Sequence, residues 1–423
     1  MITYNYFGKE QKIFYEKLEN GLDVYVIPNK NLKNYHAEFV VRYGSTTKSF
    51  KPINGKRYID IPMGTAHFLE HKVFESEDVN PFEFFSKSGV FANASTSYDN
   101  TRYYIEGKKN FKANFEYLTT MVFTPYFTDE LVNKEQGIIK EEIKMYEDQV
   151  EWNLDEFTRG NLTNTSYKDS IAGTVDSIKK ITPELLSKIY DTFYQPSNMF
   201  LIVSGNVSYK RIIDILNNNV ALKSRKTNYP IAIKSIKDTK KVIKEYGILK
   251  KDIIIPKLKY SFKFDLNTFD IKDKVILKMY LNLIIGALFS EGSDFEDKII
   301  KEKKATYFYH EHFVWDDIYV LSFNAESEYA DLLVDEIDKI VNNIQIDEQE
   351  FLRIKRIWYS IIIRSIDSQG SIADSISDDI LEDEKVIDYY ELINHLKYDE
   401  MMKVIKKMDF SNKSLTLVLP KDK

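Results

Sequence analysis

The sequence predicts an α+β protein built from two domains of similar design. In its first third, short runs rich in valine, isoleucine and aromatic residues alternate with longer segments of helical periodicity. The same alternation returns after a lysine-rich stretch that has little core-like periodicity. We therefore expect an N-terminal domain at 1–222, a linker at 223–250 with marginal strand content, and a C-terminal domain at 251–423.

Local patterns predict the elements of the N-terminal domain. Alternating or apolar runs indicate strands at 22–28, 37–43, 92–97, 101–106 and 199–203, the third and fourth forming a hairpin. Helical periodicity indicates helices at 64–75 and 129–148. Thr182-Pro183 is typical of a helix start, because a capping residue precedes proline in the first turn.

The C-terminal domain repeats this style without sharing an obvious motif with the first. A strand at 260–266 is expected to lead into a helix at 273–289, and strands at 306–312 and 319–323 follow. Several helices and a last strand at 414–419 complete the prediction.

Composition limits the chemistry that the chain can perform. The 423 residues are 43% hydrophobic and 29% charged, as in globular proteins with a sizeable core. The formal net charge of -6 argues against a nucleic-acid partner, which selects a basic face. Cysteine is absent, so disulfides, thiolate ligands and cysteine nucleophiles are excluded. Any metal must be held by histidine, aspartate or glutamate.

No targeting or membrane segment is expected. The first residues lack the basic start and apolar core of a signal peptide. No window offers the roughly 18 uninterrupted apolar residues that a membrane span needs. These patterns predict a cytoplasmic protein without a membrane span.

Two of the six histidines flank a glutamate in His67-Phe68-Leu69-Glu70-His71. On a helix, positions i, i+3 and i+4 share one face, so His67 and His71 can hold one metal ion. Glu70 is then free to act as general base on a metal-bound water. Zinc fits two imidazoles and a carboxylate with one open position. The alternative is a helix with two solvated histidines and a glutamate.

A third ligand is expected among the acids of the 129–148 helix. The candidates there are Glu135, Glu141, Glu142 and Glu147. Glu135 and Glu142 lie two turns apart on one face, and Glu141 points about a quarter turn away. Spacing does not choose between Glu141 and Glu142, and each could be a solvated acid.

The motif and its surroundings resemble the inverzincin peptidases of the insulinase, pitrilysin and mitochondrial processing peptidase family. The resemblance covers about residues 15 to 210. Its landmarks are Gly64-Thr65-Ala66 before the motif and Lys72-Val73-Phe74 after it, the segments 89–104 and 135–143, Ala172-Gly173-Thr174, and 194–199.

The resemblance assigns roles that spacing leaves open. It implies that Glu142 completes the zinc site of His67 and His71, with one Zn²⁺ per chain, and that Glu135 takes an accessory catalytic position. It also implies that Asn93 and Ala94 lie on an edge strand that binds the substrate backbone by strand addition.

The resemblance further implies two related domains, each a mostly antiparallel sheet packed with helices, as in LuxS and the processing peptidases. Two such domains would form half of a clamshell, so a homodimer or a heterodimer with a related chain is expected. Many family members hold the substrate with an arginine and, seven residues later, a tyrosine. Tyr307 matches the tyrosine, but no arginine occurs between Arg225 and Arg353, and Lys301 is one residue short of the spacing.

The combined hypothesis is a zinc-dependent endopeptidase that cleaves peptides or unfolded segments inside a chamber, in the manner of a processing peptidase. The alternative is a non-catalytic or regulatory subunit of a heterodimeric peptidase. His310 and His312 form another histidine pair, which is expected at a surface or domain interface rather than at a second metal site.

Overall fold

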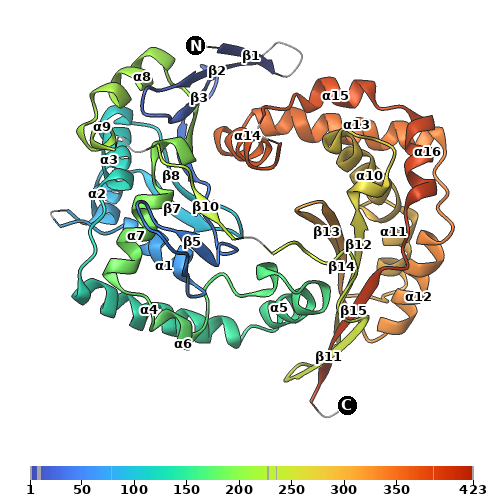
Figure 1. The fold of residues 1–423 in the computed structure, drawn as a ribbon. Coiled ribbons are helices and arrows are strands. Elements are labelled where there is room, and N and C mark those ends of the chain that lie inside the picture. The colour runs from blue at the N-terminus through green and yellow to red at the C-terminus, as the bar shows by residue number, and fades with distance from the viewer. Residues whose placement is uncertain are drawn as a thin grey trace. The chain divides into compact units, whose positions relative to one another are not determined.

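The structure, a computed structural model, describes residues 2–6, 11–77, 79–225, 228–234, 236–383 and 385–421. The chain divides into two compact units (Figure 1). Unit 1 comprises Met1–Ile143, Ser170–Ser235 and Ile361–Glu391, and unit 2 comprises Lys144–Asp169, Ile236–Ser360 and Leu392–Lys423. Each unit therefore contains segments from both halves of the sequence.

Unit 1 contains a seven-stranded sheet in the order β1-β2-β3-β9-β4-β8-β7. All neighbours are antiparallel except β3 and β9, which are parallel. The strands are β1 (Ile2–Tyr6), β2 (Gln11–Lys17), β3 (Asp23–Pro28), β4 (Tyr35–Val41), β7 (Phe91–Thr96), β8 (Thr101–Gly107) and β9 (Met199–Gly205). Strand β7 is therefore an edge strand, and the predicted hairpin is its pairing with β8.

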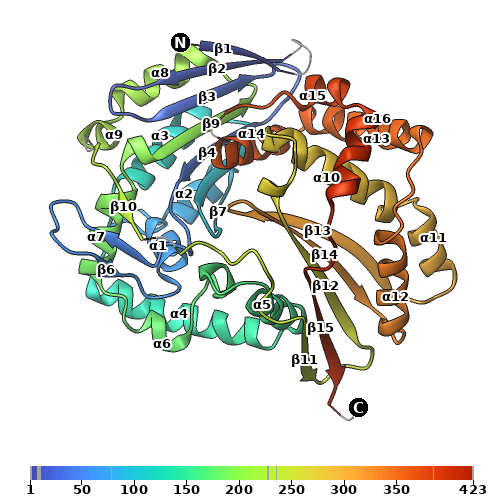
Figure 2. The same ribbon diagram turned by 45° about the vertical axis from the view of Figure 1, so that its right-hand side comes forward.

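Helices and a small sheet complete unit 1 (Figure 2). The helices are α1 (Thr65–Val73), α2 (Pro81–Lys87), α3 (Phe111–Phe123), most of α4 (Asp129–Glu147), α6 (Val175–Ile178), α7 (Pro183–Phe193), α8 (Tyr209–Asn218), α9 (Val220–Ser224) and α14 (Gln369–Asp383). The small sheet pairs β10 (Ala232–Ile233) with β5 (Ser49–Lys51), and β5 with β6 (Ile59–Asp60). The predicted helix start is confirmed, since the Thr182 hydroxyl accepts a hydrogen bond from Leu185 N at 3.3 Å.

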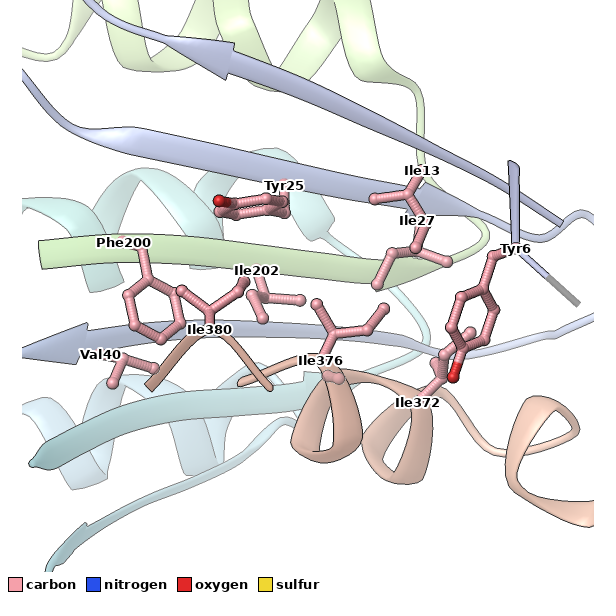
Figure 3. Close-up of a cluster of buried hydrophobic side chains, with 11 residues drawn as sticks. Tyr6, Ile13, Tyr25, Ile27, Val40, Phe200, Ile202, Ile372, Ile376 and Ile380 are labelled. Atoms are coloured by element: carbon pink, nitrogen blue, oxygen red, sulfur yellow. The ribbon is translucent and has the colours of Figure 1, made fainter. Parts of the chain in front are cut away.

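Helix α14 lies late in the sequence but packs on the sheet of unit 1. Ile372, Ile376 and Ile380 are buried against side chains of the strands (Figure 3). The strand side of this cluster contains Tyr6, Ile13, Tyr25, Ile27, Val40, Phe200 and Ile202. The core of unit 1 is thus completed by a helix whose residues the sequence assigns to the C-terminal domain.

A buried polar cluster lies beside this core. His36 on β4 is 2% exposed, and its Nδ1 and Nε2 atoms lie 3.0 Å from Glu106 and 3.2 Å from Glu38. The Glu38 carboxylate also accepts a hydrogen bond from the Ser377 hydroxyl of α14 at 2.9 Å. Burial disfavours a charged imidazole, but the hydrogen bonds to Glu106 and Glu38 outweigh it and raise the pKa of His36 to about 9.

We expect this cluster to make stability depend on pH. The pKa of His36 is higher in the folded chain than its ordinary value of 6.5, so its contribution is complete below about pH 6.5 and is lost as pH rises through about 9. The free energy of unfolding of wild-type protein, relative to His36→Gln, should therefore fall by at most about 3 kcal/mol across that interval. Urea unfolding of both proteins at several pH values measures this difference in the free energy of unfolding. A difference that does not change with pH would mean that folding does not raise the pKa of His36.

Unit 2 contains a five-stranded sheet in the order β11-β15-β12-β14-β13. Only β11 and β15 are parallel neighbours. The strands are β11 (Tyr246–Lys251), β12 (Lys257–Asp265), β13 (Tyr307–Trp315), β14 (Ile318–Glu326) and β15 (Lys413–Pro420). Its helices include α5 (Val150–Leu162), α10 (Lys274–Phe289), α11 (Asp294–Lys301), α12 (Ala330–Val341) and α16 (Tyr398–Lys407). Helices α13 (Glu348–Ile366) and α15 (Tyr389–His395), like α4, continue from one unit into the other.

One stretch of the described chain, Lys274–Lys301, is long and apolar enough to cross a membrane by length and composition alone. Within it, 61% of the most apolar window is buried inside the structure. Helix α10, which makes up most of this stretch, therefore has the burial of a core helix.

The domain boundaries inferred from the sequence stay a prediction. Contacts group the chain by packing rather than by order, and they place 144–169 in unit 2 and 361–391 in unit 1. The predicted linker holds the short strand β10 and all but the last residue of β11, while its residues 226, 227 and 235 lie outside the described residues.

Candidate metal centre

The helix that carries the His-x-x-Glu-His segment begins at a close contact between two backbone turns. Gly64 has φ of 86° and Gly173 has φ of 77°, a region that side chains rarely adopt. A Cβ on Gly64 would lie 2.5 Å from the carbonyl oxygen of Ala172, and one on Gly173 would lie 2.5 Å from that of Met63. Glycine at both positions therefore lets the start of α1 approach the 172–174 turn.

Two helices bring three potential metal ligands together. His67 and His71 lie one turn apart on α1, and Glu142 comes from α4. The Nε2 atoms of His67 and His71 lie 3.6 Å and 3.9 Å from the carboxylate oxygens of Glu142. One ligand atom from each residue lies within 4.8 Å of the other two. The neighbouring Glu141 is exposed and is not in this group.

The donor set fits zinc. Two imidazoles and one carboxylate are typical of catalytic zinc sites, and ligand bonds of about 2.1 Å place tetrahedral ligands about 3.4 Å apart. The separations from Glu142 to the two histidines are close to that value. The His67 side chain is 12% exposed, and its Nδ1 atom is buried without a hydrogen-bond partner among the described residues. This burial argues against the alternative of a solvated helix histidine.

Glu70 lies on the same helix face but is held differently. Its Oε2 atom accepts a hydrogen bond from the Thr96 hydroxyl of β7 at 2.8 Å. Burial raises the pKa of Glu70, although the Thr96 hydrogen bond acts in the opposite direction. A partly buried carboxylate with raised proton affinity beside a ligand group is the arrangement expected of a general base. The sequence pattern does not indicate that Thr96 contacts Glu70.

Glu135 orients one of the histidines. Its Oε1 atom lies 2.9 Å from Nδ1 of His71, which leaves Nε2 facing Glu142. Burial disfavours protonation of His71, but the Glu135 hydrogen bond outweighs it and raises the pKa of that imidazole. In contrast, burial and the nearby His71 lower the pKa of His67 to about 4. A carboxylate behind a ligand histidine fixes the tautomer and raises its basicity. The accessory catalytic role of Glu135 stays a prediction.

Replacing Glu135 by Gln should weaken zinc binding by about 10- to 100-fold, because such outer hydrogen-bond partners typically contribute this much. Competition with a chromophoric chelator measures the affinity. Gln136→Ala, at the next position of α4, is the control, since Gln136 bonds the Ile181 carbonyl instead of a histidine. Equal zinc affinity in wild type and Glu135→Gln would contradict the orienting role.

The residues predicted to bind substrate backbone lie on the edge strand β7. Asn93 pairs with Tyr104 and Ala94 with Tyr103 of β8, and the Asn93 amide donates a weak hydrogen bond to the Tyr104 hydroxyl at 3.4 Å. Thr96, on the same strand, contacts Glu70. The strand is therefore beside the candidate metal centre, and its role in substrate binding stays a prediction.

The remaining candidates lie in unit 2. Tyr307 is on β13, and Nζ of Lys257 lies 5.3 Å from its ring centroid. Lys301, which the sequence offered in place of an arginine, is exposed and pairs with Asp297 at 2.7 Å. A lysine next to Tyr307 is thus present, but it is Lys257 on β12. The part played by Tyr307 in substrate binding stays a prediction.

The second histidine pair does not form a metal group. Nε2 of His310 lies 3.0 Å from the Ser290 hydroxyl, and the His312 ring stacks on Tyr319 at 5.4 Å. Among the described residues, only His67, His71 and Glu142 form a group of three potential ligands.

Comparison with known proteins places these features in a family. Residues 60–175 match the model described as insulinase (peptidase family M16), and residues 180–357 match the peptidase M16 inactive domain. The "Uncharacterized zinc protease YmfH" of Bacillus subtilis (strain 168) is 37% identical over 290 residues, which are 67% of each chain. The chain belongs to the insulinase family of peptidases. The predicted family is thereby confirmed.

Solved structures share the fold of this chain. The M16-like peptidase from Alicyclobacillus acidocaldarius has a TM-score of 0.88 at 25% identity and covers 97% of this chain and 99% of that one. The periplasmic protease PqqL from Escherichia coli has a TM-score of 0.75 at 18% identity, with 97% of this chain but 48% of that one covered. The predicted α+β class with mostly antiparallel sheets is confirmed, and this chain spans about half the length of PqqL.

Proposed function

We propose that this family member is a zinc-dependent endopeptidase that cleaves peptides or unfolded segments. The observation that carries the proposal is the convergence of His67, His71 and Glu142 within 4.8 Å, with Glu70 beside them. The names of its relatives support a peptidase and a zinc cofactor.

In this proposal the roles follow from the contacts of each side chain. His67, His71 and Glu142 hold one zinc ion, which when bound supplies a Lewis acid that polarises a carbonyl and makes water more acidic. The Glu70 carboxylate takes a proton from the attacking water and passes it to the leaving amine. Thr96 holds that carboxylate in place at 2.8 Å.

Strand β7 supplies the surface for the peptide backbone. As an edge strand it carries main-chain groups that can pair with an extended peptide. Pairing through Asn93 and Ala94 would bring the peptide beside Glu70, because Thr96 on the same strand bonds that residue. Main-chain pairing of this kind selects for extended segments rather than for a particular sequence.

A second chain completes the enzyme in this proposal. The chain matches about half of the E. coli relative PqqL, whose remaining half belongs to the same polypeptide. A homodimer, or a heterodimer with a related chain, would supply the equivalent of that half. The cytoplasmic location inferred from the sequence stays a prediction.

Cleavage of a mixed pool of unstructured peptides by the purified chain tests the proposal. We expect mass spectrometry to detect cut peptides, and a chelator to abolish cutting until zinc is restored. A correctly folded chain that binds no zinc and cuts nothing would contradict the proposal.

The second candidate is a non-catalytic subunit that supports an active partner. It is favoured by the match of residues 180–357 to a domain described as inactive. Under this function the isolated chain would cut no peptide, yet would increase cleavage by a co-purified relative. Measuring zinc content and cleavage on the same sample separates the two candidates.

A further inference from the structure

Lys72 follows His71 in the sequence and has an unusual environment for a lysine. Its side chain is fully buried, whereas lysines almost never are unless they are paired. The metal and base roles proposed above do not use it. A buried ammonium costs free energy unless several acceptors surround it, so its contacts indicate what it does.

Among the residues that the structure describes, two acceptors bind the Lys72 ammonium. It pairs with the carboxylate of Glu75, beyond the end of α1, and its Nζ donates a hydrogen bond to the carbonyl oxygen of Leu131 at 3.2 Å. Leu131 lies in the first turn of α4. Lys72 therefore joins the helix of the two histidines to the helix of the acids by a charge-assisted hydrogen bond.

The position of this link on α4 matters for the metal centre. Glu135 lies one turn after Leu131, and Glu142 lies about two turns further, so all three face α1. A helix advances 1.5 Å per residue, whereas metal–ligand distances tolerate changes of only about 0.2 Å. A small slide of α4 along α1 would thus separate Glu142 from the histidines.

We propose that Lys72 is a positioning residue that fixes α4 against α1 and so sets the separation of Glu142 from His67 and His71. The inference rests on the proposed metal site and adds a residue to it. It predicts that the Lys72 link contributes to metal affinity beyond its contribution to folding.

Zinc affinity of the full-length chain, measured by competition with a chromophoric chelator, tests this role. Lys72→Met keeps the length of the side chain but removes the donor, and Lys72→Arg keeps a donor. Lys140→Met makes the same change at an exposed position of α4. Leu216→Ala removes buried volume on α8 and reports the effect of lower stability alone. The visible spectrum of bound Co²⁺ reports ligand geometry in each variant.

We expect Lys72→Met to weaken zinc binding at least tenfold and to alter the Co²⁺ spectrum. Lys72→Arg should recover part of the affinity, and Lys140→Met and Leu216→Ala should bind as wild type does. Wild-type affinity in Lys72→Met, or an equal loss in Leu216→Ala, would overturn the role of Lys72 and leave the proposed function intact. Failure of the wild-type chain to bind zinc would overturn both.

Discussion

Replacing Glu70 by Gln is expected to reduce peptide cleavage by at least about 100-fold while zinc stays bound. Glutamine has nearly the same shape and can still accept the Thr96 hydrogen bond, but it cannot take up a proton. The histidines and Glu142 are untouched, so metal affinity should change little. Initial rates on a quenched fluorescent peptide, together with zinc content, measure both effects.

Glu141→Gln is the matched control for this variant. It makes the same chemical change on α4, at an exposed acid next to Glu142. Its cleavage rate should be that of wild type. Full activity of Glu70→Gln would refute the general-base assignment, whereas loss of both zinc and activity would mean that Glu70 supports the metal centre instead.

Replacing Glu142 by Ala should weaken zinc binding by more than about 100-fold. Outer hydrogen-bond partners of metal ligands already contribute 10- to 100-fold, and Glu142 faces both histidines directly at 3.6 Å and 3.9 Å. Zinc at a hundred times its dissociation constant stabilises a native site by about 2.7 kcal/mol. Wild-type protein should therefore unfold at a higher temperature with zinc, and Glu142→Ala should lose most of that increase.

Glu141→Ala distinguishes the two acids that the sequence left open. It should keep both the affinity and the thermal shift, because Glu141 is exposed and outside the ligand group. If Glu141→Ala lost zinc binding and Glu142→Ala kept it, the assignment of the third ligand would be reversed.

Some of the strands and helices could be read from the chain, because their signals depend on local spacing, whereas β1, β2, α3 and α5 were not among the predicted elements. The sequence predicts a helix at residues 64–75, and α1 is Thr65–Val73. The hairpin after it is β7 and β8, and the helix start at Thr182 has the expected cap. Periodicity, capping and turn chemistry act within a few residues, so a single sequence displays them.

The placement of α14 could not be read in this way. Its sequence shows that one face is buried but does not indicate which sheet covers that face. Ile376 packs with Val40 and Ile202, which lie far away along the chain. The placement of residues 144–169 in unit 2 and of residues 361–391 in unit 1 has the same origin. Hydrophobic burial is non-directional, and tertiary packing alone decides which apolar faces meet.

At the candidate metal centre, the sequence alone determined that His67, Glu70 and His71 share one face of a helix, because residues three and four apart on an α-helix are neighbours. Tertiary structure decided the rest. Packing of α4 on α1 turned Glu142 rather than Glu141 toward the histidines, and packing of β7 brought Thr96 to Glu70. These partners meet only through contacts between elements distant in the chain, and helical spacing carries no information about such contacts.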